Sequence, residues 1–163
     1  MDATFDDPRL TAMGLLVEVY GGLIAQLDLV HSRRGLSGTD FDALIRLARS
    51  PHRRLRMSDL AAQTGLSTSG ITRIVDRLER RGLVCREACA GDRRGSVAVL
   101  TPPGIDLLSE HVPDVIQSID QWFTQALTPE QLTALLSALH AVRRHVRSGA
   151  AAGALRQPRT ATD

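Results

Sequence analysis

The sequence contains no lysine and no asparagine, so arginine supplies all 20 of its basic residues. Aromatic residues make up only 3% of the chain, and there are two cysteines, Cys85 and Cys89. Two cysteines are too few for the disulfide framework of a small secreted domain. No stretch approaches the roughly 18 apolar residues of a membrane span, and no signal-peptide pattern occurs. These absences predict a soluble, cytoplasmic protein.

Sequence motifs of enzymes and metal sites are missing as well. There is no glycine-rich phosphate loop and no motif around an activated nucleophile. The five histidines are scattered, and none stands beside cysteine or carboxylate residues at the spacing of a zinc site. His140 and His145 share a predicted helix but, being five residues apart, do not share a face. We therefore expect no catalytic residue, no cofactor and no bound metal.

The basic residues are concentrated in the middle of the chain, although the net charge of the whole is only +2. Residues 1–31 carry one arginine against five acidic residues, residues 32–101 carry fourteen against seven, and residues 102–163 carry five against six. A cationic segment is expected where a protein faces a polyanion, because neutralised phosphates release counterions. A solvated charged surface would show the same pattern, so the arrangement within the segment has to distinguish the two.

Apolar residues recur every three or four positions in several segments, which predicts amphipathic helices. The first spans residues 8–31 after the start signal Asp7-Pro8. Its Gly21-Gly22 pair either bends the helix or lets another chain approach closely. A second helix covers residues 37–50, and an arginine-rich link follows it.

The cationic segment contains the residue spacing of a helix-turn-helix, in which two helices pack steeply across a tight turn. Ala61 is small where helices 57–64 and 67–81 cross, Gly65 suits the positive φ of the turn, and Ile71 fills the angle between the helices. The second helix then presents hydroxyl groups, arginines and Asp76 outward. Short hydroxyls at a helix N-terminus contact phosphates or bases, and arginine is the commonest reader of guanine. We predict DNA contacts from Ser67, Thr68, Ser69, Thr72, Arg73 and Arg77.

Alternating apolar and polar residues predict two short strands, residues 83–87 and 96–101, joined by a polar loop. The order helix, helix, strand, loop, strand is that of a winged helix. Arg93 and Arg94, at the predicted loop tip, are expected to enter the adjacent minor groove, whose negative potential attracts arginine. A solvated turn is the simpler interpretation of the loop alone. We expect Asp92 to orient an arginine rather than to contact DNA.

Two further helices are predicted after the winged segment. One opens at residue 102 and contains Pro113, which should kink it. The other opens with a capping box, Thr128-Pro129-Glu130-Gln131, and carries an apolar stripe up to Val146. Together with helix 8–31 they present more apolar surface than a small winged domain covers, so we expect a protein partner.

These segments resemble the MarR family of bacterial winged-helix regulators. The resemblance is carried by Leu36-Ser37, Asp40-Phe41, the runs 60–67 and 75–84, Asp92-Arg93-Arg94, Leu100-Thr101 and Gly104. The Asp-x-Arg pattern of Asp92 and Arg94 is its most specific mark. The resemblance implies an obligate homodimer in which the N-terminal helix and the last two helices intertwine. Two recognition helices would then lie on a pseudo-palindromic operator.

The resemblance also implies a cleft for small aromatic or phenolic anions between the dimer helices and the winged unit. The residues on the helices expected to meet there are Tyr20, His31, Phe41, Arg46 and His111. Tyr20 and Phe41 lie on apolar stripes, so a place in the core is the simpler role for them. Cys85 and Cys89 act either as a thiol sensor beside the wing or, for Cys85, as a small buried filler.

The sequence thus predicts a mainly α, α+β protein: a winged helix-turn-helix with N- and C-terminal dimerisation helices. One domain covers residues 1–147, with the winged unit at 32–101, dimerisation helices at 8–31 and 102–147, and a disordered tail at 148–163. The predicted function is a ligand-responsive homodimeric repressor that binds a short inverted repeat. A winged-helix protein-interaction module and a thiol-based redox regulator are the alternatives.

Overall fold

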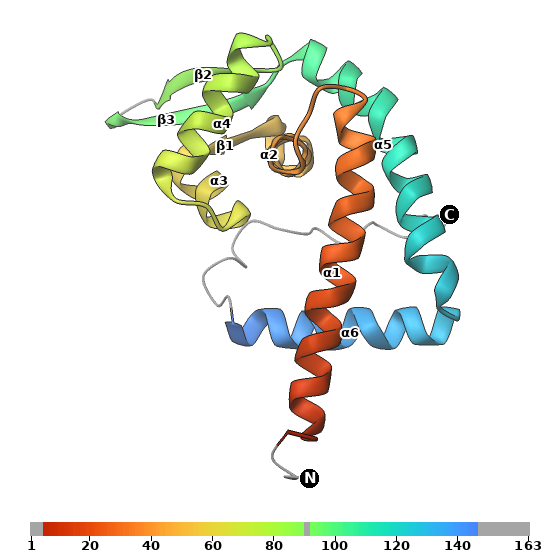
Figure 1. Cartoon of the computed structure of the whole chain (residues 1–163). Coiled ribbons are helices and arrows are strands. Elements are labelled where there is room, and N and C mark those ends of the chain that lie inside the picture. The colour runs from red at the N-terminus through yellow and green to blue at the C-terminus, as the bar shows by residue number, and fades with distance from the viewer. Residues whose placement is uncertain (1–4, 90–91, 147–163) are drawn as a thin grey trace, which may run out of the picture.

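The computed structural model describes residues 5–89 and 92–146, with the side chains of all of these except 89 and 92–95. This part of the chain forms six α-helices, three strands and two short 3-10 turns (Figure 1). The helices are α1 (Pro8–Ser32), α2 (Gly38–Arg49), α3 (Met57–Thr64), α4 (Thr68–Arg80), α5 (Pro102–Trp122) and α6 (Pro129–Val146). The strands are β1 (Arg54–Arg56), β2 (Val84–Cys89) and β3 (Asp92–Leu100), and the turns are η1 (Pro51–Arg53) and η2 (Thr124–Ala126). The tail predicted at 148–163 lies outside the described residues.

The elements divide into a winged unit and an arm of long helices (Figure 1). α2, α3, α4 and the three strands gather at one end, whereas α1 and α5 run side by side away from them. α6 lies across the far end of this arm. The arrangement confirms the predicted winged helix-turn-helix with long helices on both sides of it in sequence.

Helix boundaries follow the capping signals in the sequence. The Asp7 carboxylate accepts a hydrogen bond of 2.8 Å from the backbone N–H of Arg9, and Pro8 occupies the first position of α1. Ser37 and Asp40 form a reciprocal capping box at the start of α2. Because caps satisfy backbone N–H groups within a few residues, these starts were readable from local sequence.

The sheet is antiparallel with the strand order β1-β3-β2. β1 was not predicted, since its three residues are too few to show an alternating pattern and its partner β3 comes far later in the chain. Its pairing runs from Arg54 opposite Val99 to Arg56 opposite Val97. The arginine-rich link therefore forms the turn η1 and an edge strand rather than an irregular connection.

The strands of the wing extend further than their apolar pattern indicated. β2 continues to Cys89 and β3 begins at Asp92, so the loop predicted over residues 88–95 shrinks to residues 90–91, which lie outside the described residues. The pairing shifts register between Ala88 and Cys89. The sequence of residues 88–95 consists of small and charged residues with one cysteine, so it contains no alternation of apolar and polar residues.

One apolar core joins α2, α3, α4, the sheet and the start of α5. Gly104 lets α5 approach the end of the winged unit closely, because a Cβ at this position would collide with the Leu83 carbonyl oxygen. The core thus fixes α4 relative to both the sheet and α5. Its largest fully buried apolar side chains are Leu44, Leu47, Leu60, Ile71, Leu78, Val75 and Val84.

The arm of long helices is largely exposed in the single chain. Only Val30 and His31 of α1 are buried, no residue of α6 is, and Tyr20, expected in the core, is 65% exposed. α1 is also long and apolar enough to cross a membrane by length and composition. The prediction that no stretch approaches this limit was wrong, because it counted uninterrupted apolar runs, which Glu18 breaks.

α5 continues as one helix through Pro113.

Candidate DNA interface

The turn between α3 and α4 has the geometry that the helix-turn-helix spacing predicts. Gly65 adopts a left-handed conformation with φ of 74°, and its N–H donates to the Ala61 carbonyl over 2.9 Å. The Leu66 N–H donates to the same carbonyl over 3.1 Å. Ile71 fills the angle between the helices and is fully buried. The crossing of α3 and α4 is therefore set by these local residues.

α4 has one buried face and one exposed face. Ile71, Ile74, Val75 and Leu78 turn into the core, and the opposite face carries the hydroxyl groups and arginines. Thr68, Ser69 and Arg73 are exposed there. Because the first backbone N–H groups of α4 also open on this end, the exposed face can receive a phosphate and the edges of bases.

Two of the predicted hydroxyl contacts also have structural roles. The Ser67 hydroxyl caps α4 by accepting from the Gly70 N–H over 3.1 Å, and it lies 3.1 Å from the Ser69 hydroxyl. The Thr72 hydroxyl donates to the Thr68 carbonyl over 2.8 Å. Both oxygens are held in place by hydrogen bonds within the first turns of α4.

Arg86 of β2 neutralises the acidic residues on α4. Its guanidinium lies 2.6 Å from the Asp76 carboxylate and 2.8 Å from that of Glu79, and it also donates to the Thr72 carbonyl over 3.2 Å. The backbone N–H of Arg86 donates to Glu79 over 2.9 Å. Asp76 would otherwise present an unpaired charge toward DNA phosphates. The sequence interpretation missed this residue, although strand alternation with buried Val84 places it on the face toward α4.

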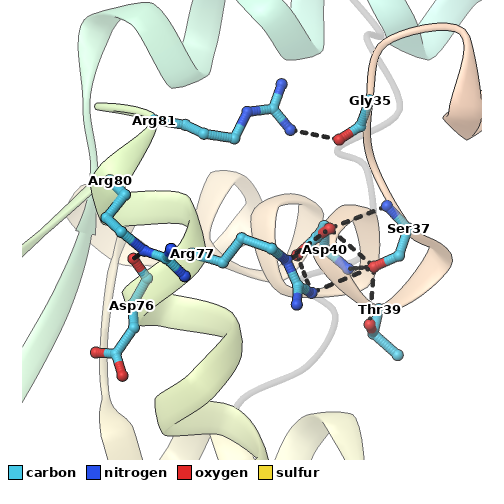
Figure 2. Close-up of polar contacts among 8 residues, drawn as sticks. All are labelled: Gly35, Ser37, Thr39, Asp40, Asp76, Arg77, Arg80 and Arg81. Atoms are coloured by element: carbon cyan, nitrogen blue, oxygen red, sulfur yellow. Dashed lines mark hydrogen bonds and ion pairs between the residues drawn. The ribbon is translucent and has the colours of Figure 1, made fainter.

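Arg77 lies on the opposite edge of α4 and points toward α2 (Figure 2). Its Nη2 donates to Asp40 Oδ1 over 2.6 Å, and its Nε donates to both carboxylate oxygens over 3.0 and 3.2 Å. The Asp40 side chain is only 3% exposed. Burial alone would raise the pKa of Asp40, but hydrogen bonds from Arg77 and Ser37 hold it below its ordinary value. This predicted DNA contact thus has a buried carboxylate as its partner within the chain.

The two wing arginines are placed by their backbone only. Arg93 and Arg94 belong to the first half of β3 rather than to a loop tip. Their side chains, and that of Asp92, lie outside the described residues. Their contacts with DNA stay predictions.

Three of the five residues predicted around a ligand come together where α1, α2 and α5 meet. His31 Nδ1 lies 2.9 Å from His111 Nε2, and the Phe41 ring stacks on His31 at a centroid distance of 4.6 Å. Both histidines are buried, and burial is the main cause that lowers the pKa of each. Tyr20 is exposed far along α1, and Arg46 pairs with Asp42 over 2.8 Å.

A separate hollow lies between α1 and α5, beside Phe123 at the end of α5. It measures about 220 Å³ and has an apolar lining with two polar residues. None of the five predicted ligand residues lines it. The residues around it are Leu23, Gln26, Leu27, Ser118, Ile119, Trp122 and Phe123.

Neither metal nor thiol chemistry gains support from the arrangement. Among residues 5–89 and 92–146, no three His, Cys, Asp or Glu side chains lie together as a metal site would require. Cys85 is a half-buried free thiol on β2, opposite Val99 of β3. The side chain of Cys89 lies outside the described residues, so the thiol sensor stays a prediction.

Known proteins match both the sequence and the fold. The MarR family model matches residues 34–95. The transcriptional repressor MprA of Escherichia coli (strain K12) is 29% identical over 117 residues, which span 72% of this chain and 66% of MprA. AbsC, a MarR family transcriptional regulator from Streptomyces coelicolor, is 37% identical with a TM-score of 0.81, covering 87% of this chain and 96% of AbsC.

A second solved structure shows a relative bound to DNA. Sco3205, a MarR family transcriptional regulator from Streptomyces coelicolor, was solved in complex with DNA. It is 33% identical with a TM-score of 0.80, covering 84% of this chain and 90% of Sco3205. The match extends over the helix-turn-helix, the wing and the long helices. The chain therefore belongs to the MarR family and is a DNA-binding transcriptional regulator.

Proposed function

We propose that the protein is a homodimeric repressor that places its two copies of α4 in successive major grooves of a short inverted repeat. The observation that carries the dimer is α6, an 18-residue helix in which no residue is buried. Leu136, Leu139 and Val142 are among its exposed apolar side chains. Such a stripe is stable in water only when it is covered. Residues 1–147 would then act as one domain whose long helices form the dimer.

Within each half-site, we assign base reading to the exposed face of α4. Arg73 is exposed at the centre of this face and, by its long planar side chain, suits a guanine edge. Ser67, Thr68 and Ser69 at the N-terminus suit phosphates, with Thr72 beside them. Arg93 and Arg94 are proposed to enter the minor groove next to it. Two half-sites read in this way lie roughly 34–36 Å apart.

Repression and ligand response belong to the same proposal. The name of MprA records a repressor, and a dimer that covers its operator would block transcription by occupancy. A small aromatic or phenolic anion that binds among the dimer helices would lower DNA affinity on one condition. It must bind more tightly to a dimer whose two α4 helices are not at the spacing of the operator than to one whose helices are. Acting on chromosomal DNA, the protein would work in the cytoplasm and have no enzymatic role.

The test is a fluorescence-anisotropy titration with the promoter DNA that flanks its own gene, repeated across salt concentrations. We expect the logarithm of affinity to fall linearly with the logarithm of salt concentration, because arginines displace counterions from phosphates. Arg73→Ala should relax discrimination at one base pair in each half-site by about 1–3 kcal/mol. A chain that binds no DNA at low salt would instead be a protein-interaction module, and this outcome would overturn the proposal.

A further inference from the structure

Two arginines near the end of α4 bind the corner of the molecule where α1 is joined to α2, one at the connecting turn and one at the first turn of α2. Arg81, the residue that caps α4, donates from Nη1 to the Gly35 carbonyl over 2.6 Å and from Nη2 to the Arg34 carbonyl over 3.0 Å. Arg77, one turn earlier, binds the Asp40 carboxylate at the start of α2 (Figure 2). The recognition helix is therefore fastened at two neighbouring points to the same corner of the molecule.

The turn that receives Arg81 is itself closely tied to the long helices. The Gly35 N–H donates to the Ser32 carbonyl over 3.0 Å, and the Leu36 N–H donates to the His31 carbonyl over 3.1 Å. The Arg34 side chain pairs with Glu110 of α5 over 2.8 Å. The turn thus continues the last turn of α1, and it links α1 to the end of α4 by hydrogen bonds.

We propose that Arg77 and Arg81 are positioning residues, which hold the recognition helix at a fixed place relative to α1 and do not contact DNA. This inference rests on the proposed dimer, in which α1 belongs to the interface between copies. The two arginines on each copy would then set the distance between the two α4 helices and hence the operator spacing that the dimer accepts.

The chemistry of Asp40 favours this role over a phosphate contact for Arg77. If Arg77 turned to DNA, it would leave a buried carboxylate without its cationic partner. A contact between Arg77 and a DNA phosphate would compensate for only part of this cost, because the phosphate is solvated and screened by counterions. The backbone carbonyls bound by Arg81 likewise lose their charged donor if that side chain moves away.

Three arginines at the end of α4 and its cap provide a matched set of variants: Arg77→Ala, Arg81→Ala and, as control, Arg80→Ala. Arg80 is exposed, and its side chain donates to the Asp76 carbonyl within α4 over 3.3 Å. Arg80→Ala therefore removes the same charge without releasing the contacts between α4 and the start of α2. Affinity for the inverted repeat is measured against salt concentration. We expect affinity to fall about tenfold in Arg77→Ala and in Arg81→Ala. This is the loss expected when only about a tenth of the dimers keep the two α4 helices at the spacing that binds DNA.

The salt dependence separates a positioning residue from a DNA contact. We expect the slope of log affinity against log salt to stay at the wild-type value in Arg77→Ala and Arg81→Ala. A lost phosphate contact would reduce that slope by about 0.9 for each contact, hence by about 2 in a dimer. A reduced slope would overturn the inference. Failure of the wild-type protein to bind would instead overturn the proposed function.

In Asp40→Asn the change in DNA affinity has opposite signs for the two possible roles of Arg77, a DNA contact and a positioning residue. It frees Arg77 and removes a negative charge, so a DNA-contacting Arg77 would bind DNA more tightly in this variant. We expect weaker binding, together with less discrimination between operators whose half-sites differ by one base pair in spacing. The double variant Arg77→Ala/Asp40→Ala removes the buried charge along with its partner and keeps the chain folded. Unchanged spacing discrimination in the double variant would also overturn the inference.

Discussion

At the scale of single residues, the buried pair His31 and His111 makes stability depend on pH. Burial lowers the pKa of His31, and His111 adds to this, whereas Asp28 opposes it. Burial also lowers the pKa of His111, with Asp114 opposing and Arg34 adding. The unfolded chain therefore takes up protons at a higher pH than the folded chain does. The free energy of unfolding is therefore highest well above pH 6.5, where both histidines are neutral in the folded and the unfolded chain. It decreases as the pH falls through about 6.5 and below.

We expect the urea concentration at the midpoint of unfolding to decrease as the pH is lowered from 7.5 to 5.5. Carboxylates such as Asp40 stay ionised over this range. His111→Asn should flatten this dependence, because it removes one of the two buried imidazoles. His52→Asn, at an exposed position of η1 in the winged unit, is the control and should leave the dependence as in the wild type. A midpoint that does not change with pH, or a control that flattens it equally, would contradict the assignment.

Single residues differ in how far local sequence can reveal their role. Ala61, Gly65 and Ile71 were identified because a helix-turn-helix fixes the residue types within a short span of chain. Arg77 was predicted as a DNA contact because its helix position faces outward. Its partner Asp40 lies 37 residues earlier, so only the tertiary packing of α2 against α4 shows that the side chain is occupied.

At the scale of elements, β2 holds and neutralises the recognition helix through Arg86. Arg86→Met should keep much of the packing of this side chain but leave Asp76 and Glu79 without their cation. Since both acids lie on α4, we expect DNA affinity to fall by roughly tenfold while stability changes by about 1 kcal/mol or less.

Asp76→Asn provides the check on this explanation. Added to Arg86→Met, it should restore part of the lost affinity, because the repulsion between the carboxylate and the phosphates is gone. The measurement is DNA affinity at fixed salt for the single and double variants, with thermal unfolding to monitor stability. Equal affinity of the single and double variants would show that Arg86 acts in some other way.

Elements with a strong local signal were predicted well, and those defined by distant pairing were not. The starts of α1 and α2 follow from capping residues within one turn. β1 exists only because β3 pairs with Arg54–Arg56, and no pattern in three residues announces such a partner. The two wing strands were predicted too short because residues 88–95 do not alternate between apolar and polar residues.

At the scale of the whole molecule, α1 and α6 leave many apolar side chains exposed, which the proposed dimer would cover. α1 has the length and composition of a membrane span, but it is followed directly by the winged unit and packs along α5. Gly14, Gly21 and Gly22 leave open space beside the helix, since a Cβ at each would meet nothing within 4 Å apart from the adjoining backbone of α1 itself. In the proposed dimer a second copy of the chain would fill this space, and the close approach of another chain at the glycine pair stays a prediction.

Leu139→Glu tests the dimer at the centre of α6. Leu139 is 42% exposed in the single chain, so the charge costs little in a monomer but is strongly unfavourable in an apolar interface. We expect sedimentation velocity to show a folded monomer. Affinity for the full inverted repeat should fall by about 100-fold or more, because the second half-site is no longer held at high effective concentration.

The matched control is Ser137→Glu, which places the same charge on an exposed polar position of α6. This variant should remain dimeric and bind the inverted repeat normally. Affinity for a DNA with a single half-site should be similar in the Leu139→Glu variant and the wild type, because each winged unit carries its own α4 and core. A Leu139→Glu protein that stays dimeric would place the dimer interface elsewhere. Loss of half-site binding would instead show that the winged unit depends on the partner for its fold.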